Sequence, residues 1–360
     1  IALAGGATGR IGDPSFRDEE RSLLDEDTLA ANLAGIRRDL GAVIDLSDPG
    51  RGVLVDNFEW TRDVSVLEFL RDVGRHFSVN AMINRESVKK RLTEREQGLS
   101  FAEFSYQLLQ AFDFAHLYAT EGCKLQGGGS DQWGNITAGI DLVRRTRHAE
   151  VFGFTWPLVT KADGTKFGKS QSGNVWLDPA RTSPYQFFQF WVNTDDRDVG
   201  RYLRQFTFRS REEIEALEGT LAERPGEREP HRALARDVTA LVHGEEEAAA
   251  AERASAALFG GDLRDLDEAT LAEVFGDAPS SRVAASRLDR DGVALVDLLA
   301  ESGLVASKSA ARQAVTQGGV SVNGVREADL DRRLGRADLL AGRYLVLRRG
   351  KRNYHLVDAG

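Results

Sequence analysis

The chain has 360 residues, of which 41% are hydrophobic and 29% are charged, and this length is enough for two or three packed domains. The apolar content excludes a disordered chain, and the longest apolar run, around residues 152–159, is too short to span a bilayer. The single cysteine excludes an intrachain disulfide and a metal site built from cysteines, and it predicts a cytoplasmic, reducing environment.

The net charge of −9 is distributed unevenly along the chain. Residues 293–360 carry 11 Lys or Arg against 7 Asp or Glu, whereas residues 186–276 carry 11 against 20. A basic module on an acidic body indicates a phosphate-rich partner such as a nucleic acid, because long-range attraction depends on local charge. A solvated surface with uneven charge explains the same numbers equally well.

Residues 1–185 alternate short apolar runs with amphipathic segments and glycine-rich turns, which predicts an α/β fold with a parallel sheet covered by helices. Because a fold rarely begins inside a sheet, the apolar run at Ile1 leads us to expect further residues before it. The predicted strands are residues 1–4, 53–55, 124–126 and 158–160, and the predicted helices are residues 27–40, 64–74, 87–95 and a helix that begins after Ser100.

The second half of the chain has a different pattern. Leucines at helical spacing among many Glu and Arg predict an α-helical domain up to residue 278, and the polar stretch 279–292 is typical of a linker. Residues 293–360 form a small α/β module, with helices at 296–302 and 309–316 and hairpins at Asn323-Gly324 and at the basic tip 348–352. The predicted domains are therefore 1–185, 186–278 and 293–360.

The segment Ser100 to Phe114 contains an unusual polar stripe. Ser100 with Glu103 predicts the start of a helix, and at 100° per residue Tyr106, Gln110 and Asp113 fall on one side of it. A solvent-facing stripe normally contains Lys, Arg or Glu, which this one lacks. A hydroxyl, an amide and a carboxylate on one helix face predict a polar pocket that holds an ammonium group and a second hydroxyl.

Two glycine-rich segments follow predicted strands, at residues 5–14 and 126–135. Glycines at the carboxyl end of a parallel strand let the backbone approach a ligand, and an acidic residue just beyond accepts hydrogen bonds from ribose hydroxyls. A tight structural turn is the alternative interpretation of residues 126–135. The arginines that follow the first segment, Arg17 and Arg21, could reach phosphate, although ordinary surface arginines fit the same spacing.

A third segment, KADGTKFGKS at residues 161–170, holds three of the eight lysines of the chain. Two ammonium groups three residues apart, with a hydroxyl beside them, can neutralise a triphosphate while charge develops on departing pyrophosphate. A Walker-type phosphate loop is rejected, because Gly164 to Gly168 is one residue too short and Asp163 stands where glycine is required.

Together, the segments GGATGRIGDPS, FSYQLLQAFDF, LQGGGSDQWGN and KADGTKFGKS resemble bacterial tyrosyl-tRNA synthetases, which are class I aminoacyl-tRNA synthetases, in the order of that family. The resemblance extends from Ile1 through the basic tail and implies a Rossmann-like catalytic domain. The family's first signature, His-Ile-Gly-His, is not among these residues, so we expect it in a segment before Ile1. Residues 293–360 resemble a small RNA-binding module shared with a ribosomal protein; a dimerisation tail is the alternative.

The resemblance also implies a role for individual residues. Asp13, Tyr106 and Gln110 correspond to groups that hold the substrate ammonium, and Asp113 to the acceptor of the phenolic hydroxyl. Supporting contacts are implied for Gln126 and Asn57, and ribose contacts for Gly129 and Asp131. The implied catalytic residues are Lys166, Lys169, Ser170, Gln132, Arg17 and Arg21, with Lys169 also binding ATP, and the expected RNA contacts are Lys308, Arg312, Arg348, Arg349, Lys351 and Arg352.

The implied reaction is the ATP-dependent activation of L-tyrosine followed by transfer to the 3′ end of tRNA(Tyr), with Mg²⁺ accompanying ATP and with no tightly bound cofactor or dedicated metal site. A homodimer is expected through Phe101 and the stretch 64–77. One alternative is a tryptophanyl-tRNA synthetase relative, but an indole has no hydroxyl for Asp113. The other is a noncatalytic RNA-binding protein that keeps the synthetase shape.

Overall fold

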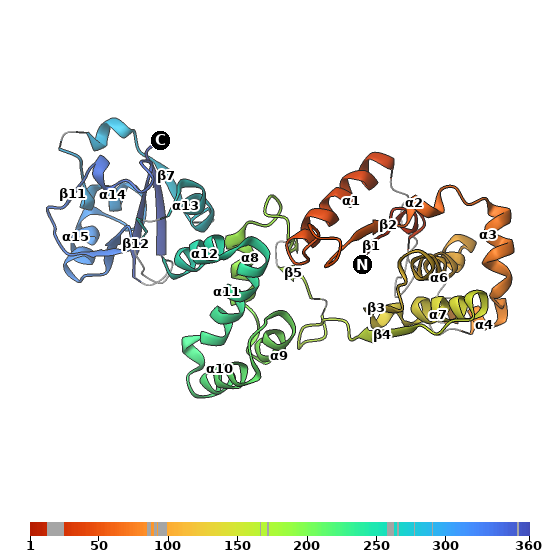
Figure 1. Cartoon of the computed structure of the whole chain (residues 1–360). Coiled ribbons are helices and arrows are strands. Elements are labelled where there is room, and N and C mark those ends of the chain that lie inside the picture. The colour runs from red at the N-terminus through yellow and green to blue at the C-terminus, as the bar shows by residue number, and fades with distance from the viewer. Residues whose placement is uncertain are drawn as a thin grey trace. The chain divides into compact units, whose positions relative to one another are not determined.

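The computed structural model describes residues 1–12, 25–84, 88–89, 92, 99–165, 167–170, 173–257, 263–264, 266–276, 278–289, 291–350 and 353–360. Within these residues the chain divides into two compact units, residues 1–167 and 168–360. Figure 1 shows the elements of each unit along the chain from red to blue.

The first unit contains two pairs of parallel strands, which confirms the predicted α/β fold. Strand β1 (Ala2–Ala4) pairs with β2 (Leu54–Asp56), and β3 (Leu125–Gly129) pairs with β4 (Phe152–Trp156). The fourth strand therefore precedes the predicted 158–160. The helices described in this unit are α1 (Glu26–Gly41), α2 (Phe58–Thr61), α3 (Val66–Asp72), α4 (Val79–Ile83), α6 (Phe101–Glu121) and α7 (Trp133–Arg147).

Helix α6 is the central helix of the first unit. It begins where the sequence predicts, because the Ser100 side chain accepts a hydrogen bond from the Glu103 amide at 3.2 Å, and it ends at Gly122 in the left-handed conformation that glycine favours. Phe114 of α6 packs directly on Gly139 of α7, where a Cβ atom would lie 2.9 Å from the ring. This contact belongs to the apolar core that fixes α6 against α7.

The second unit begins with the short antiparallel pair β5 (Lys169–Ser170) and β6 (Gly173–Asn174) and continues as helices, as predicted. Ser183 caps the first helix, and Pro184 follows at its first turn. The described helices are α8 (Pro184–Val192), α9 (Asp196–Phe206), α10 (Arg211–Glu223), α11 (Glu229–His243), α12 (Glu245–Ala257) and α13 (Glu268–Val274).

The C-terminal module is a five-stranded sheet with helices α14 (Leu295–Glu301) and α15 (Lys308–Thr316). The predicted Asn-Gly hairpin is present: Asn323 and Gly324, both with positive φ, join two strands of the sheet. A further pair, β8 (Val293–Ala294) with β11 (Arg333–Leu334), lies outside this sheet. In order across the sheet the strands are β10 (Val325–Glu327), β9 (Val320–Val322), β12 (Tyr344–Arg349), β13 (Asn353–Asp358) and β7 (Ser280–Arg282).

Strand β7 lies in the segment that the sequence predicts to be a linker. It pairs in parallel with β13, with Ser281 opposite Val357, and Ser281 Oγ lies 2.9 Å from Nε2 of the buried His355. Residues 280–282 are therefore part of the C-terminal sheet rather than a flexible connection. The polar sequence concealed this strand, because its pairing uses backbone groups that every residue has.

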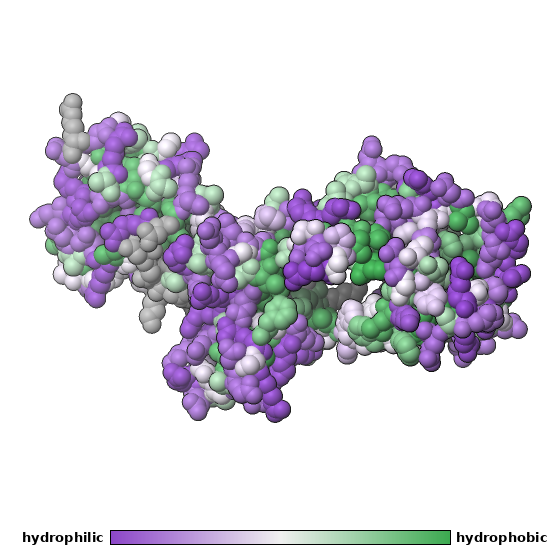
Figure 2. All heavy atoms as spheres, in the orientation of Figure 1, coloured by the Kyte–Doolittle hydropathy of each residue, from purple (hydrophilic) through white to green (hydrophobic). Residues whose placement is uncertain are grey.

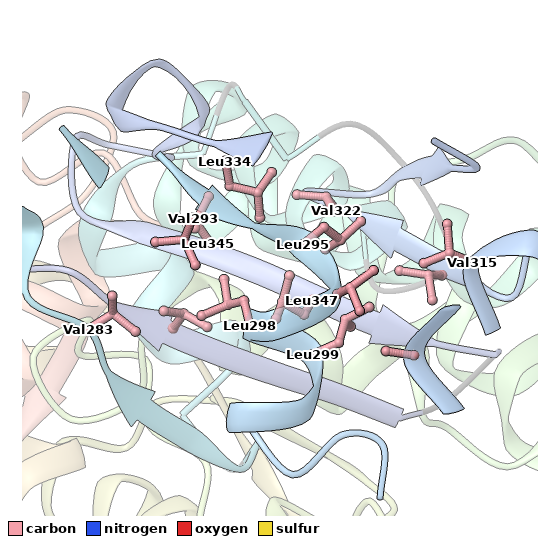
Figure 3. Packing of buried hydrophobic residues seen from close by; sticks show 14 of the residues in the cluster. Val283, Val293, Leu295, Leu298, Leu299, Val315, Val322, Leu334, Leu345 and Leu347 are labelled. Carbon is pink, nitrogen blue, oxygen red and sulfur yellow. The ribbon is translucent and has the colours of Figure 1, made fainter. Parts of the chain in front are cut away.

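Both faces of the C-terminal sheet are covered. Leu345 and Leu347 of β12 pack on the core beneath α14 and α15 (Figure 3). The alternate residues Tyr344 and Val346 belong to a second core together with Phe275 beside α13, as the two-residue period of a strand requires. The segment before residue 279 therefore packs directly on the module that follows it.

Candidate functional site

The carboxyl ends of β1 and β2 bring two glycines beside two polar side chains. Ala4 lies opposite Asp56 in the parallel register, and the amide of Gly6 donates to Asp56 Oδ1 at 3.0 Å. A Cβ atom on Gly6 would lie 2.1 Å from that oxygen, so a larger residue at this position would displace the Asp56 carboxylate. The next amide, of Ala7, donates to Asn57 Oδ1 at 2.7 Å. The loop after β1 is thus tied to the residues after β2.

Asn57 and Asp113 are in contact at the centre of the site. Asn57 is fully buried, and Asp113 is 2% exposed. The Nδ2 atom of Asn57 donates to Asp113 Oδ2 at 2.9 Å and to Thr8 Oγ1 at 3.0 Å. Two residues predicted to hold one substrate, 56 positions apart in sequence, therefore share a hydrogen bond.

Trp60 is a second donor to this carboxylate, and the sequence did not predict it. Its indole Nε1 donates to Asp113 Oδ1 at 2.9 Å. Trp60 lies in the single-turn helix α2, three residues after Asn57, so both donors come from one short segment. The sequence does place Asn57 and Trp60 one helical turn apart after a strand. A single turn is too short to show helical periodicity, so this pattern did not predict a shared site.

Burial raises the pKa of Asp113 to about 6, against the lowering effect of the hydrogen bonds from Asn57 and Trp60. The effect of desolvation outweighs that of the two donors, because a carboxylate removed from water loses more solvation free energy than two neutral hydrogen-bond donors restore. The group is ionised at pH 7. Each oxygen has one protein donor and can accept another, so a substrate hydroxyl fits here as a third donor.

Tyr106 and Gln110 lie on the same helix as Asp113, seven and three residues before it, and are half-buried. Residues with this spacing share one face of a helix, so the predicted polar stripe has the burial expected of a partly covered face rather than of a solvent face. The ammonium site assigned to them stays a prediction.

The residues predicted to contact the nucleotide, Gly129, Asp131 and Gln132, lie just before the start of α7. Gln132 Nε2 donates to Asp131 Oδ2 at 2.9 Å, and Asn135 Nδ2 donates to Gln132 Oε1 at 3.2 Å. A Cβ atom on Gly129 would lie 2.5 Å from Asp131 Oδ1. On β3, the Oε1 atom of Gln126 is buried and has no hydrogen-bond partner among the described residues. The predicted role of Gln126 in supporting the substrate stays a prediction.

The lysine-rich loop is described in part. The Asp163 carboxylate accepts from the amide and the hydroxyl of Thr165, at 2.9 and 2.6 Å, which forms a tight turn before the signature lysines. Lys169 and Ser170 have extended backbone in β5. Asp13, Arg17, Arg21 and Lys166 lie outside the described residues.

The basic residues predicted to contact RNA lie at one end of the C-terminal module. Arg349 donates to the carbonyl of Leu304 at 3.3 Å, just before α15, and Lys308 begins α15 with an ion pair to Asp297 at 2.8 Å. Arg348 donates to Ser321 Oγ at 3.1 Å, and Arg312 is exposed. Lys351 and Arg352 lie outside the described residues.

The described residues contain no group of three or more His, Cys, Asp or Glu that could hold a metal ion. In the same part of the chain, no helix has the length and apolar character needed to cross a membrane. Hydrophilic residues cover most of the visible surface in Figure 2.

Comparison with known proteins relates this geometry to characterised families. Residues 1–260 match the model of "tRNA synthetases class I (W and Y)", and residues 270–357 match that of the "Tyrosine--tRNA ligase SYY-like C-terminal domain". The chain is 52% identical to the tyrosine–tRNA ligases of Roseiflexus castenholzii and Bacillus caldotenax, with 99% of this chain and 84% of each relative covered.

Solved structures agree with the sequence relatives. A C-terminally truncated mitochondrial tyrosyl-tRNA synthetase from Aspergillus nidulans matches with a TM-score of 0.63 and 33% identity, covering 71% of this chain and 76% of that one. The corresponding structure from Coccidioides posadasii matches with a TM-score of 0.58 and 31% identity, covering 69% and 72%.

Proposed function

The chain belongs to the class I tRNA synthetases of the W and Y family and is a tyrosine–tRNA ligase, and we propose that Asp113 selects tyrosine by accepting its phenolic hydroxyl. The observation that carries this proposal is the buried carboxylate with one donor on each oxygen. Phenylalanine has no hydroxyl to donate to this carboxylate. A buried charge that lacks a hydrogen-bond donor is energetically unfavourable, so phenylalanine should bind more weakly than tyrosine. The tryptophanyl alternative is disfavoured because an indole offers no hydroxyl at this position.

The ammonium group of tyrosine is held by Tyr106 and Gln110 together with Asp13 in this proposal. The first two share the α6 face that carries Asp113, which sets the ammonium and the hydroxyl sites at a fixed separation along one helix. Gln126 and Asn57 support the pocket. This support rests on the buried Gln126 oxygen and on the Asn57 bridge between Thr8 and Asp113.

The first chemical step joins tyrosine to ATP. A tyrosine carboxylate oxygen attacks the α-phosphorus, pyrophosphate leaves with the electron pair of the broken P–O bond, and tyrosyl-adenylate forms. Gly129 and Asp131 contact the ribose, and Gln132 lies near the reacting groups. The signature loop and the arginines before α1 neutralise the charge on the departing pyrophosphate. The residues concerned are Lys166, Lys169, Ser170, Arg17 and Arg21. Mg²⁺ that accompanies ATP would add positive charge at the phosphates.

The second step transfers the tyrosyl group to tRNA. A terminal ribose hydroxyl of the tRNA attacks the carbonyl carbon of the adenylate, and AMP leaves. The C-terminal module holds the tRNA through its basic end, where Lys308, Arg312, Arg348 and Arg349 lie; contacts from Lys351 and Arg352 are part of the same proposal. The net positive charge of residues 293–360 supports this assignment, since phosphate contacts supply most of the affinity for RNA. A cytoplasmic location follows from the single cysteine and stays a prediction.

A homodimer forms through the apolar face of α3 and the start of α6 in this proposal. Val66 is 72% exposed, Leu67 79% and Phe101 77%. Exposed aliphatic and aromatic residues in such number are typical of an interaction surface. Mass measurement in solution tests the dimer, and Phe101→Asp is expected to shift it toward the monomer.

Asp113→Ala tests the assignment of the hydroxyl acceptor. In the protein expressed from its complete reading frame, we expect tyrosine-dependent pyrophosphate exchange to fall below detection. Glu121→Ala removes an exposed carboxylate from the same helix and is expected to keep exchange within about twofold. Exchange retained by Asp113→Ala would refute the assignment, and the absence of exchange in the unmodified protein would favour the noncatalytic RNA-binding alternative.

A further inference from the structure

We infer that His116 is a positioning residue for tyrosine recognition, because its ring stacks on Trp60 and thereby directs the indole N–H toward Asp113. This inference rests on the proposed role of Asp113 and extends it to a residue that does not contact the carboxylate.

The orientation of Trp60 is not set by its own helix. Helix α2 is a single turn, and none of its residues is fully buried. A half-buried indole on one turn of helix can rotate about two side-chain bonds, and most of those rotations point Nε1 away from a given acceptor. The rotamer that places Nε1 at 2.9 Å from Asp113 Oδ1 is therefore selected by contacts from outside α2, of which the bond to Asp113 is one.

His116 is the group in contact with the indole face. The two ring centroids are 4.5 Å apart and the planes differ by 15°, which is a stacked arrangement. His116 lies three residues after Asp113 on α6, so one helical turn supplies both the acceptor of the indole N–H and the surface that holds the ring.

The imidazole ring is itself held in place by neighbouring aromatic residues. Phe112 of α6 lies 6.4 Å from it in a tilted arrangement, and Phe69 of α3 meets Phe112 edge to face at 6.0 Å. This aromatic row connects the carboxylate site to α3. Burial lowers the pKa of His116 and thereby favours the neutral ring, so we attribute its effect on Trp60 to stacking and shape rather than to charge.

The stacking role predicts which substitutions are tolerated. His116→Phe keeps a flat ring and is expected to leave the Trp60–Asp113 hydrogen bond intact. His116→Leu fills similar space without a plane and is expected to release the indole. A weakened bond to a charged acceptor should raise KM for tyrosine about three- to tenfold while kcat changes little, since it acts on bound substrate and transition state alike.

The hydrogen bond can be observed directly in the chain labelled with ¹⁵N-tryptophan. The chain has five tryptophans, and the Trp60 indole resonance is the one that disappears in Trp60→Phe. We expect this resonance to keep its position in His116→Phe and to shift upfield and exchange faster with solvent in His116→Leu. An unchanged resonance in His116→Leu, or an equal change in His116→Phe, would overturn the inference.

Pyrophosphate exchange in the protein from the complete reading frame then tests the effect on substrate. When Trp60 is present, we expect His116→Leu to raise the KM for tyrosine. In a protein that already carries Trp60→Phe, we expect His116→Leu to change this KM by less than about twofold, because the two residues act through one hydrogen bond. Equal effects in both backgrounds, or no rise in KM, would contradict the inference. Tyrosine activation retained by Asp113→Ala instead refutes the proposed function, whereas the indole resonance still reports on the stack.

Discussion

Asp113 shows how one buried charge links stability to recognition. Its folded pKa of about 6 lies above the ordinary value of 3.8, so the folded state binds its proton more tightly than the unfolded state does. The stabilising contribution of the protonated form is complete below about pH 4 and is lost as the pH rises through about 6. The ligase thus retains an ionised acceptor at neutral pH at a cost in folding free energy.

Asp113→Asn should reveal this cost in its pH dependence. The difference between pKa values of 3.8 and about 6 corresponds to about 3 kcal/mol. As the pH rises from 4 to 7, the free energy of unfolding of the unmodified protein should therefore fall by up to this amount, compared with that of Asp113→Asn. Urea unfolding at several pH values measures the difference, in which other titrating groups cancel. A difference that does not change with pH would show that Asp113 is not desolvated.

Single residues also show what the sequence could reveal of the site. The polar stripe that includes Asp113 was visible in the sequence because it lacks Lys, Arg and Glu, whereas the roles predicted for Asp113 and Asn57 came from the family resemblance. Trp60, Thr8 and Asp56 were not found, because each acts through a hydrogen bond to a residue about 50 positions away: Trp60 to Asp113, Thr8 to Asn57 and Asp56 to Gly6. Such contacts leave no local pattern.

At the scale of elements, the predictable features are those with a local cause. The Ser100 cap fixed the start of α6, and Asn323-Gly324 fixed a hairpin, since few residues accept positive φ. Strand β4 was misplaced toward residue 158 although Phe152, Phe154 and Trp156 alternate with small residues, and β7 was hidden by a polar sequence. In both strands the position depends on pairing with a distant partner.

The close contact between α6 and α7 gives a prediction about Gly139. A Cβ atom at this position would lie 2.9 Å from the Phe114 ring, so Gly139→Ala should destabilise the protein by about 1–3 kcal/mol in spite of the better helix propensity of alanine. Gly35→Ala in α1 is the matched control, because a Cβ atom added there would have no neighbour within 4 Å, and it should stabilise by about 0.5–1 kcal/mol. Urea unfolding compares the two, and equal effects would contradict the packing argument.

At the scale of the whole molecule, the C-terminal module extends further toward the amino terminus than its composition indicates. The sheet face with Tyr344, Val346 and Leu356 is covered by Leu271 and Phe275, and β7 adds an edge strand. The segment before residue 279 is thus part of the packed module, whereas a free linker would make no such contacts.

The boundary of the module can therefore be tested with two fragments. Residues 263–360 contain both cores of the sheet except for Ala254 of α12, and they should give a dispersed NMR spectrum and a cooperative thermal transition. Residues 293–360 lack β7 and Phe275 and should expose an apolar face and aggregate or unfold. In the whole chain, Phe275→Ala should cost about 3–5 kcal/mol, because Phe275 is 2% exposed, while Phe208→Ala, at a side chain that is 94% exposed, should cost little. If residues 293–360 fold as stably as the longer fragment, then the segment before residue 279 contributes nothing to the module, and the linker expected from the sequence is the better description.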